Sequence, residues 1–317
     1  MLKHQLKSVL KRSSLCQWAA SGLRRGVEMP GPAELDMALS AIIPSGGEPR
    51  SEEFSRLSRI RYVSGKTRMP NDPFSPDYMA RQKDLYLEVS GCAGYDFGNE
   101  ATSFDFDTQK DDFFPYNTKS PDYVGEQLLK QGFLIKHMRL QPGSRIVEFG
   151  AGWGNTTVQM AMMGYDVTAV EVNPASIRLI RHRAASHGRE IRIADRDMVS
   201  FARESDQRFD AALFVASFHH CDDHLVLLRH LSRLLSENGR IYFADEPILP
   251  AWSPILPYPW GLRLDGPSLF YIRRYGWLEL GFRENYLREA LRREGWSLSR
   301  IPSPVPEVPD LYVASRS

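Results

Sequence analysis

A glycine-rich turn between an apolar run and a helical pattern constrains the fold of this chain more than any other feature. Residues 146–149 read Ile-Val-Glu-Phe, glycines follow at 150, 152 and 154, and Val158, Met160 and Ala161 continue with helical spacing. The pattern is that of a strand, a tight loop and a helix. Glycine permits the sharp turn and lets backbone N–H groups approach a ligand closely. The sequence therefore predicts the opening unit of a nucleotide-binding α/β domain.

The spacing of these glycines separates two kinds of nucleotide site. A dinucleotide fingerprint has glycines at the first, third and sixth positions of the turn. Here Gly150, Gly152 and Gly154 take the first, third and fifth positions, and Glu148 stands two residues before the first glycine. This E-x-G-x-G-x-G pattern resembles the first motif of the class I S-adenosylmethionine (SAM)-dependent methyltransferases. The resemblance implies that the loop passes under the methionine part of SAM, and that Glu148 is linked to the amino group of the cofactor.

The second predicted strand, Asp166–Glu171, ends in a carboxylate 17 residues after Gly154. A carboxylate at this strand end meets the need for acceptors that face the two ribose hydroxyls of a nucleotide. We therefore assign Glu171 to cofactor binding, in agreement with the methyltransferase pattern.

The third predicted strand, Glu190–Ala194, is followed by Asp195 and Asp197. In the family that the motif resembles, an acid or amide here accepts a hydrogen bond from the adenine amino group. Both aspartates qualify, and we prefer Asp197 because apolar Met198 follows it. The alternative is that Asp197 caps the next helix.

Polar side chains follow the fourth and fifth predicted strands, at the edge where parallel strands open onto a ligand crevice. The strand at Phe209–Ala216 leads into Ser217, His219 and His220, and the strand at Arg240–Ala244 leads into Glu246 after an Asn238–Gly239 turn. The resemblance places such residues beside the cofactor and the transferred methyl group. We expect Ser217 to contact the cofactor and His219, His220 or Glu246 to act as general base, with the choice among the three open. The histidines and aspartates at 219–224 are too close in sequence to converge on one ion, so we predict no metal site.

The sequence outside these motifs predicts further segments around the nucleotide-binding domain. Residues 1–55 are expected to be a basic N-terminal segment and a linker, residues 56–115 an accessory or cap region, and residues 116–317 the methyltransferase domain. A Pro-rich, aromatic insertion at 247–282 interrupts that domain. The predicted fold is a Rossmann-like α/β domain with a seven-stranded, mostly parallel sheet, an antiparallel last strand and helices on both faces.

Composition excludes some function classes. The 317 residues carry a net charge of +1, which gives no electrostatic support for a nucleic-acid partner, and three distant cysteines suggest no disulfide framework. Residues 1–26 are basic and lack acids. They fit weak contact with an anionic membrane surface, a mitochondrial transit peptide, or a solvated terminus. The expected location is the cytoplasm, with attachment to an inner membrane or a mitochondrial location as alternatives.

The sequence predicts a SAM-dependent methyltransferase that acts on a hydroxyl of a small-molecule or glycan- or lipid-linked acceptor. Arg263, Arg273 and Arg274 alternate with aromatics in the 247–282 insertion, which suits an acceptor with sugar rings and an acidic group. Two alternatives remain: an inactive SAM-binding scaffold protein, and an NAD-dependent oxidoreductase, which the glycine spacing disfavours. Oligomeric state is left open.

Overall fold

The computed structural model describes residues 27–43, 49, 51–112, 114, 116, 118–253 and 256–317. Contacts within the chain define two compact units. One consists of Met1–Glu100 with Pro247–Leu287, and the other of Ala101–Glu246 with Arg288–Ser317. The basic segment at 1–26, for which we expected contact with a membrane surface, lies outside the described residues.

The second unit is built on a seven-stranded sheet. Its strands are β3 (Arg145–Phe149), β4 (Asp166–Glu171), β5 (Arg192–Asp195), β6 (Phe209–Val215), β7 (Leu235–Ala244), β11 (Trp296–Ile301) and β12 (Leu311–Arg316). They lie in the order β11-β12-β7-β6-β3-β4-β5. Strands β3 to β7 are parallel, whereas β12 is antiparallel to both β7 and β11. This confirms the predicted sheet and its antiparallel last strand.

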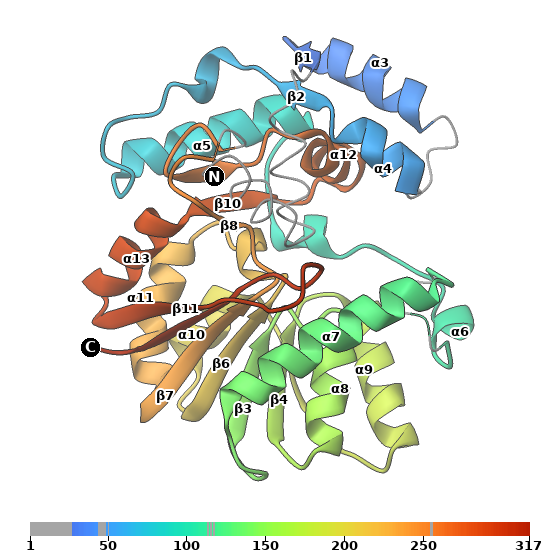
Figure 1. The fold of residues 1–317 in the computed structure, drawn as a ribbon, viewed down its shortest axis with the longest axis vertical. Helices are drawn as coiled ribbons and strands as arrows, with labels where there is room; N and C mark the ends of the chain where they lie inside the picture. Colours follow the sequence, from blue (N-terminus) through green and yellow to red (C-terminus); the bar gives the residue numbers. More distant parts are fainter. Residues whose placement is uncertain are drawn as a thin grey trace, which may run out of the picture. The chain divides into compact units, whose positions relative to one another are not determined.

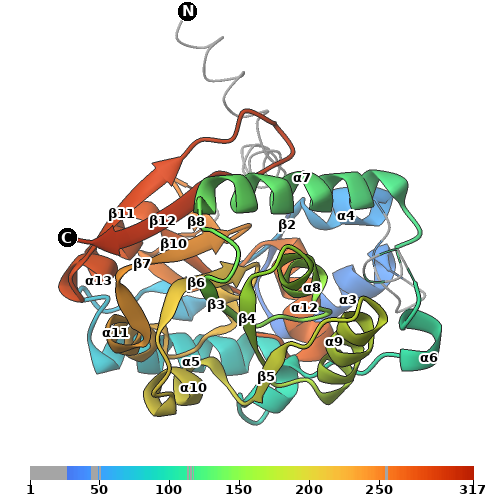
Figure 2. The same cartoon turned by 90° about the horizontal axis from the view of Figure 1, so that it is seen from below.

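Helices cover both faces of this sheet (Figure 1; Figure 2). One face carries α7 (Pro121–Met138), α8 (Asn155–Met162) and α9 (Pro174–Ser186), and the other carries α10 (Met198–Glu204), α11 (His224–Leu234) and α13 (Glu284–Arg293). Helix α7 begins as the sequence predicts, because Pro121 takes the first turn and the Ser120 side chain accepts from the Tyr123 N–H.

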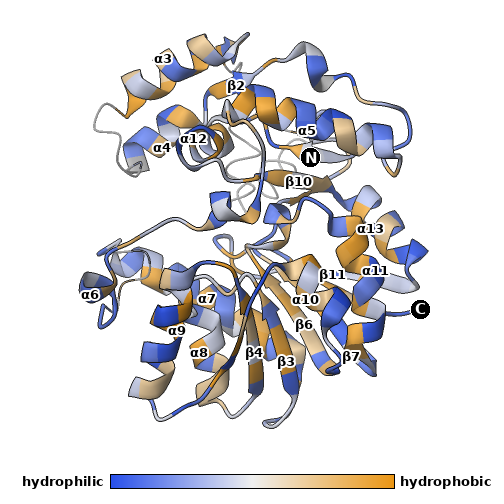
Figure 3. Ribbon diagram, turned by 180° about the vertical axis from the view of Figure 1, so that it is seen from behind, coloured by the Kyte–Doolittle hydropathy of each residue, from blue (hydrophilic) through white to orange (hydrophobic). Residues whose placement is uncertain are grey.

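Alternate residues of each buried strand serve the two faces, so the central strands are mostly apolar (Figure 3). Leu134 and Met138 of α7 pack with Ile146 and Leu213 on one face. On the other face, Phe149, Phe214 and Phe243 from three adjacent strands stack with ring centroids 5.0 and 5.4 Å apart. This close packing fixes the relative positions of the strand ends that carry the polar side chains.

The first unit contains two small sheets and four α-helices among its described residues. Strands β1 (Val27–Met29) and β2 (Ile60–Tyr62) form a parallel pair, and β8 (Ile248–Leu249), β10 (Leu280–Arg283) and β9 (Trp260–Leu262) form a three-stranded sheet. The helices are α3 (Pro32–Ile42), α4 (Ser51–Leu57), α5 (Pro76–Ser90) and α12 (Gly266–Tyr275). Helix α5 is tied to the 247–282 segment, because Tyr78 and Gln82 both donate to the Trp260 carbonyl, at 2.7 and 3.1 Å.

Several local expectations were wrong. Residues 28–55, part of which we predicted to be a linker, contain most of β1, all of α3 and the start of α4. The predicted 247–282 insertion is folded as well, and contains β8, β9, α12 and part of β10. Buried apolar residues such as Leu35 and Leu269, both 0% exposed, stabilise these elements despite the prolines nearby. Asn238–Gly239 is not a turn before a strand but an irregularity within β7, where the register with β6 shifts. The domain boundaries that we predicted stay a prediction.

No helix among the described residues combines the length and the apolar character that a membrane crossing requires.

Candidate functional site

The glycine loop at 150–154 joins β3 to α8 in a conformation that needs glycine at all three positions. Gly150, Gly152 and Gly154 have φ of 65°, 53° and 74°, in the left-handed region. A Cβ on Gly150 would lie 2.7 Å from Ser217 Cβ, and one on Gly154 would lie 2.6 Å from Ile180 Cγ1. A Cβ on Gly152 would meet nothing closer than the Tyr116 hydroxyl, at 3.8 Å. The outer two glycines therefore pack against the protein, while the backbone at Gly152 borders open space.

Glu148, at the end of β3, is a buried carboxyl. It is 2% exposed and accepts a hydrogen bond from the Thr157 hydroxyl on α8. Burial raises the pKa of Glu148 to about 7, and the nearby Glu171 carboxylate adds to this effect, while the bond from Thr157 opposes it. A buried carboxyl with a pKa near neutrality suits a site that receives a cationic group.

Glu171, at the end of β4, is bound to backbone donors. One carboxylate oxygen accepts from the Gly152 N–H at 2.6 Å, and the other accepts from Val172 and Asn173 at 2.9 and 2.8 Å. Burial raises the pKa of Glu171, and these N–H groups act against that shift. Glu171 therefore supports the open part of the glycine loop directly.

The residues after β5 and β6 also converge on this loop. The Met198 methyl group lies 3.0 Å from the position of a Cβ on Gly150, and the Ser217 hydroxyl donates to the Phe149 carbonyl at 2.7 Å. Asp197 caps α10, because its carboxylate accepts from the Ser200 N–H at 2.8 Å. The cap that we considered as an alternative is thus present, and the adenine role of Asp197 stays a prediction.

The ends of β6 and β7 both turn through a left-handed residue. Ala216 and Asp245 have φ of 51° and 56°, a conformation that costs a non-glycine residue of order 1–3 kcal/mol and recurs at functional sites. These turns direct Glu246 back toward the segment that follows β6. Glu246 accepts from the N–H groups of Ser217 and Phe218, at 2.6 and 2.7 Å.

Glu246 also holds one of the two histidines. His219 Nδ1 lies 2.8 Å from Glu246 Oε2, and both side chains are buried. Burial raises the pKa of Glu246 to about 7, and its backbone donors and the charge of His220 lower it. The His220 ring lies on the His219 ring, with centroids 4.1 Å apart, and is less buried. The geometry therefore pairs Glu246 with His219 rather than with His220.

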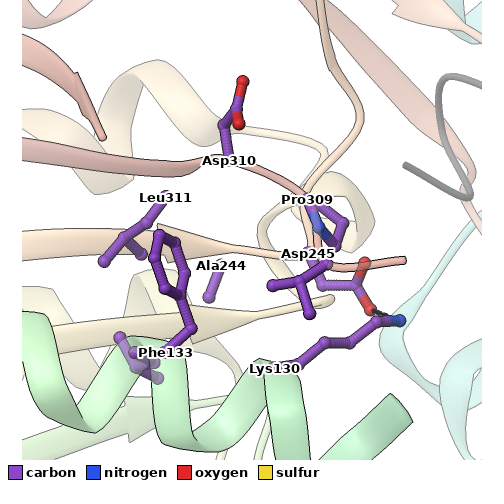
Figure 4. Close-up of a pocket in the computed structure, with 9 residues that line it drawn as sticks. Lys130, Phe133, Ala244, Asp245, Pro309, Asp310 and Leu311 are labelled. Carbon is purple, nitrogen blue, oxygen red and sulfur yellow. Dashed lines mark hydrogen bonds and ion pairs between the residues drawn. The ribbon is translucent and has the colours of Figure 1, made fainter. Parts of the chain in front are cut away.

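A small hollow lies on the other side of the β7 end, between α7 and the residues before β12 (Figure 4). Its volume of about 10 Å³ is roughly what one water molecule needs. Lys130 and Asp245 form an ion pair of 2.7 Å in its wall. This ion pair anchors the β7 end to α7, and the hollow itself is too small for an organic ligand.

Four residues that the site analysis of the sequence did not select lie around the loop. Arg183 on α9 donates to Trp153 O and Asn155 Oδ1 at 3.2 and 3.1 Å, and to two further carbonyls. Thr157 binds Glu148, and Phe104 packs on Trp153 with centroids 4.6 Å apart. Trp153 and Thr157 belong to the strand–loop–helix unit of the glycine motif and were within reach of the sequence, whereas Arg183 and Phe104 come from distant segments. Asp223 caps α11, because its carboxylate accepts from the Val226 N–H.

Two tyrosines that precede β3 lie near the loop: Tyr116 lies over it, and Tyr123 is the neighbour of Tyr116, with ring centroids 6.5 Å apart. Asn117 lies outside the described residues.

Comparisons with known proteins agree with this arrangement. Residues 146–239 match the family model described as a methyltransferase domain. The ubiquinone biosynthesis O-methyltransferase of Xanthomonas axonopodis pv. citri is 26% identical over 114 residues, which are 36% of this chain and 48% of that protein. The protein of the same name from Xanthomonas campestris pv. campestris is 26% identical over 110 residues, covering 35% and 46%. The chain thus spans about half the length of these curated relatives.

Solved structures with similar folds include two methyltransferases. Magnesium protoporphyrin IX methyltransferase from Synechocystis, with bound SAM, has a TM-score of 0.45 at 16% identity and covers 77% of this chain and 99% of its own. The 1,6-didemethyltoxoflavin-N1-methyltransferase from Burkholderia thailandensis has a TM-score of 0.44 at 22% identity and covers 62% and 81%.

Three findings agree. They are the seven-stranded sheet with its antiparallel β12, the glycine loop at the centre of the sheet, and the match to the methyltransferase family model. Residues 146–239 carry a methyltransferase domain, in agreement with the resemblance of the glycine motif to the class I SAM-dependent methyltransferases.

Proposed function

We propose that this protein transfers the methyl group of SAM to a hydroxyl oxygen of a small-molecule acceptor. The observation that carries the choice of an oxygen acceptor is the buried pair of His219 and Glu246, 2.8 Å apart. It lies next to Ser217, whose hydroxyl is bonded to the residue just before the glycine loop. The names of the curated relatives, which are O-methyltransferases of ubiquinone biosynthesis, support the same acceptor class.

The residues around the loop fit the cofactor. The backbone at Gly152 borders open space, where a bound molecule approaches N–H groups without a side chain between them. Glu148 and Glu171 would face the cationic amino group and the ribose hydroxyls, and Met198 and Ser217 would line the same surface. When bound, SAM supplies a methyl group on a sulfonium, which is already a strong electrophile. The protein has therefore mainly to align the acceptor oxygen for in-line attack.

The His219–Glu246 pair supplies the remaining requirement, which is removal of the hydroxyl proton. When Glu246 is ionised it would accept from Nδ1–H, and the neutral His219 ring would then carry its lone pair on Nε2. His219 would take the acceptor proton on Nε2 as the hydroxyl oxygen forms its bond to the methyl carbon. Glu246 would act as the positioning residue, because its other bonds, to Ser217 and Phe218, fix its carboxylate. Of the three residues that the sequence offered as the base, His219 would thus be the base and Glu246 the residue that positions it.

Two other functions are separable by experiment. An inactive SAM-binding scaffold protein would bind SAM without turnover. An NAD-dependent oxidoreductase would bind NAD, which the glycine positions and the methyltransferase family match disfavour. We also propose a glycan- or lipid-linked acceptor as an alternative to a free small molecule. Weak membrane contact through residues 1–26 and a cytoplasmic or mitochondrial location are proposals about where the protein acts.

The first test is calorimetric titration with SAM, S-adenosylhomocysteine and NAD. We expect micromolar binding of the first two and none of NAD; the absence of SAM and S-adenosylhomocysteine binding to folded protein would overturn the proposal. Turnover is then followed as S-adenosylhomocysteine release with polyhydroxylated aromatic acceptors. Turnover on none of a broad set of hydroxyl acceptors would favour the scaffold function.

The base is tested with His219→Ala. Loss of a positioned base should lower kcat by at least about 100-fold and leave the Kd for SAM unchanged. In the wild type, activity should rise as the pH passes about 7, where Glu246 becomes the carboxylate that holds His219, and His219→Ala should remove this rise. His187→Ala, at the exposed end of α9, is the matched control. Wild-type kcat and pH dependence in His219→Ala would show that this histidine is not the base.

A further inference from the structure

Helix α7, which lies across one face of the seven-stranded sheet, has an apolar outer face (Figure 1). The helix packs on the sheet through Leu134 and Met138, which are each 1% exposed. Away from these residues, Leu128 and Leu129 in the middle of the helix are 50% and 47% exposed. Two adjacent leucines that stay about half exposed gain only part of the stabilisation that full burial gives.

Two glycines flank these leucines along the helix. Gly125 and Gly132 lie in the interior of α7, where glycine is among the least favourable residues. A Cβ added to either glycine would meet no atom within 4 Å, so the packing of α7 on its own chain does not require glycine there. Glycine on a helix surface lets a second backbone approach closely. The outer face therefore combines exposed apolar side chains with two points of close approach.

The outer face has the residue spacing through which helices pair. Its row consists of Asp122, Gly125, Leu129, Gly132 and Lys136, which are separated by three, four, three and four residues. Steps of three and four keep side chains on one side of a helix, and two helices pack against each other along such a seam. The charged residues stand at the two ends of the row, and the leucine stands at its centre.

The charges at the two ends of the row are opposite. Asp122 is in the first turn of α7 and Lys136 in the last. Neither side chain makes a hydrogen bond or an ion pair within the ranges that the structure describes. When a second copy lies antiparallel on this face, Asp122 of each copy comes beside Lys136 of the other, and Gly125 comes beside Gly132. The row is thus complementary to itself under a two-fold rotation, which is the condition for an isologous dimer.

We propose that two copies of this chain associate through α7, antiparallel and related by a two-fold axis near Leu128 and Leu129. A second copy necessarily brings the same row in reverse order, so the opposite end charges favour it over a different protein or another segment of the chain. One helix from each copy makes an interface smaller than the standard one of about 1,600 Å². We therefore expect a dissociation constant in the micromolar range. The inference does not depend on the proposed function.

The test is sedimentation velocity of the full chain at concentrations from about 1 to about 100 μM, on either side of the expected dissociation constant. The wild type should pass from monomer to dimer over this range. Leu129→Glu places two carboxylates against each other at the axis, and should weaken association at least about tenfold. Met163→Glu is the matched control, because Met163 is a similarly exposed apolar residue, 48% exposed, at the end of α8. It should leave association unchanged.

Charge reversal tests the antiparallel arrangement. Lys136→Glu brings two acids together at each end of the row and should weaken the dimer, whereas Lys136→Glu combined with Asp122→Lys should restore it. Both positions are exposed, and circular dichroism checks that each variant keeps its fold. A wild type that stays monomeric over the whole range overturns the inference. A dimer that Leu129→Glu leaves intact, or a double reversal that restores nothing, overturns it as well, because association would then use another surface or another orientation.

Discussion

Replacement of Glu148 by glutamine should make the protein more stable at neutral and alkaline pH, although it removes a proposed cofactor-binding group. Burial raises the pKa of Glu148 from 4.5 to about 7. The folded chain therefore holds this proton more tightly than the unfolded chain does. The stability that comes from this tighter proton binding is fully present below about pH 4.5. It is lost as the pH rises to about 7. At about 1.36 kcal/mol per pH unit, the interval corresponds to about 3 kcal/mol.

The glutamine side chain in Glu148→Gln carries no charge at any pH, and its amide oxygen can still accept from the Thr157 hydroxyl. Its NH₂ group needs partners of its own, which reduces the gain. We expect Glu148→Gln to unfold with a free energy about 1–3 kcal/mol above wild type at pH 8, and with a difference below about 1 kcal/mol at pH 5. The measurement is urea denaturation of both proteins, followed by circular dichroism from pH 5 to pH 8.5.

The stability difference between the two proteins reports on residue 148 alone, because the other buried carboxyls titrate in both proteins. Among these are Glu246 and Asp265, whose pKa values are raised to about 7 and about 6. A stability difference that does not change with pH would refute the argument. A Glu148→Gln variant that becomes less stable than wild type as the pH rises would refute it as well. SAM affinity of the same variant should fall at every pH, so stability and binding should change in opposite directions.

Three other substitutions test the loop and its support. Gly150→Ala should destabilise the protein by about 2–4 kcal/mol in urea denaturation, because its Cβ would lie 2.7 Å from Ser217 Cβ at a φ of 65°. The Cβ of Gly152→Ala would meet no atom closer than 3.8 Å, so this variant should lose only about 1–2 kcal/mol of stability, from its backbone conformation. It should nevertheless bind S-adenosylhomocysteine more than tenfold more weakly than wild type. Equal stability losses for the Gly150 and Gly152 variants would contradict this reasoning. Arg183→Met should lower the unfolding free energy by about 1–3 kcal/mol, since four acceptors lose their donor, whereas exposed Arg181→Met should change it little.

The sequence was sufficient for the second unit because its signals are local. Apolar runs of strand length, glycine positions, and the Ser120 and Asn173 caps each depend on residues within a few positions of one another. The same local signals failed at residues 28–55 and 247–282, where prolines and glycines suggested a linker and an irregular insertion. Helix α3 forms there because it packs on β1 and α4 and buries Leu35, and α12 because it packs on α4, α5 and β2, about 200 residues earlier in the chain, and buries Leu269.

The sequence by itself determined the sheet, the glycine loop, and the set of polar residues at the strand ends, since a parallel sheet brings those ends to one edge. Only the tertiary structure decided which of these residues pair. Glu246 binds His219 because left-handed turns at Ala216 and Asp245 direct two neighbouring strand ends toward each other. Arg183 and Tyr116 reach the glycine loop through contacts that span 30 residues or more. Pairing across such separations depends on how the elements pack, and no residue pattern along the chain encodes it.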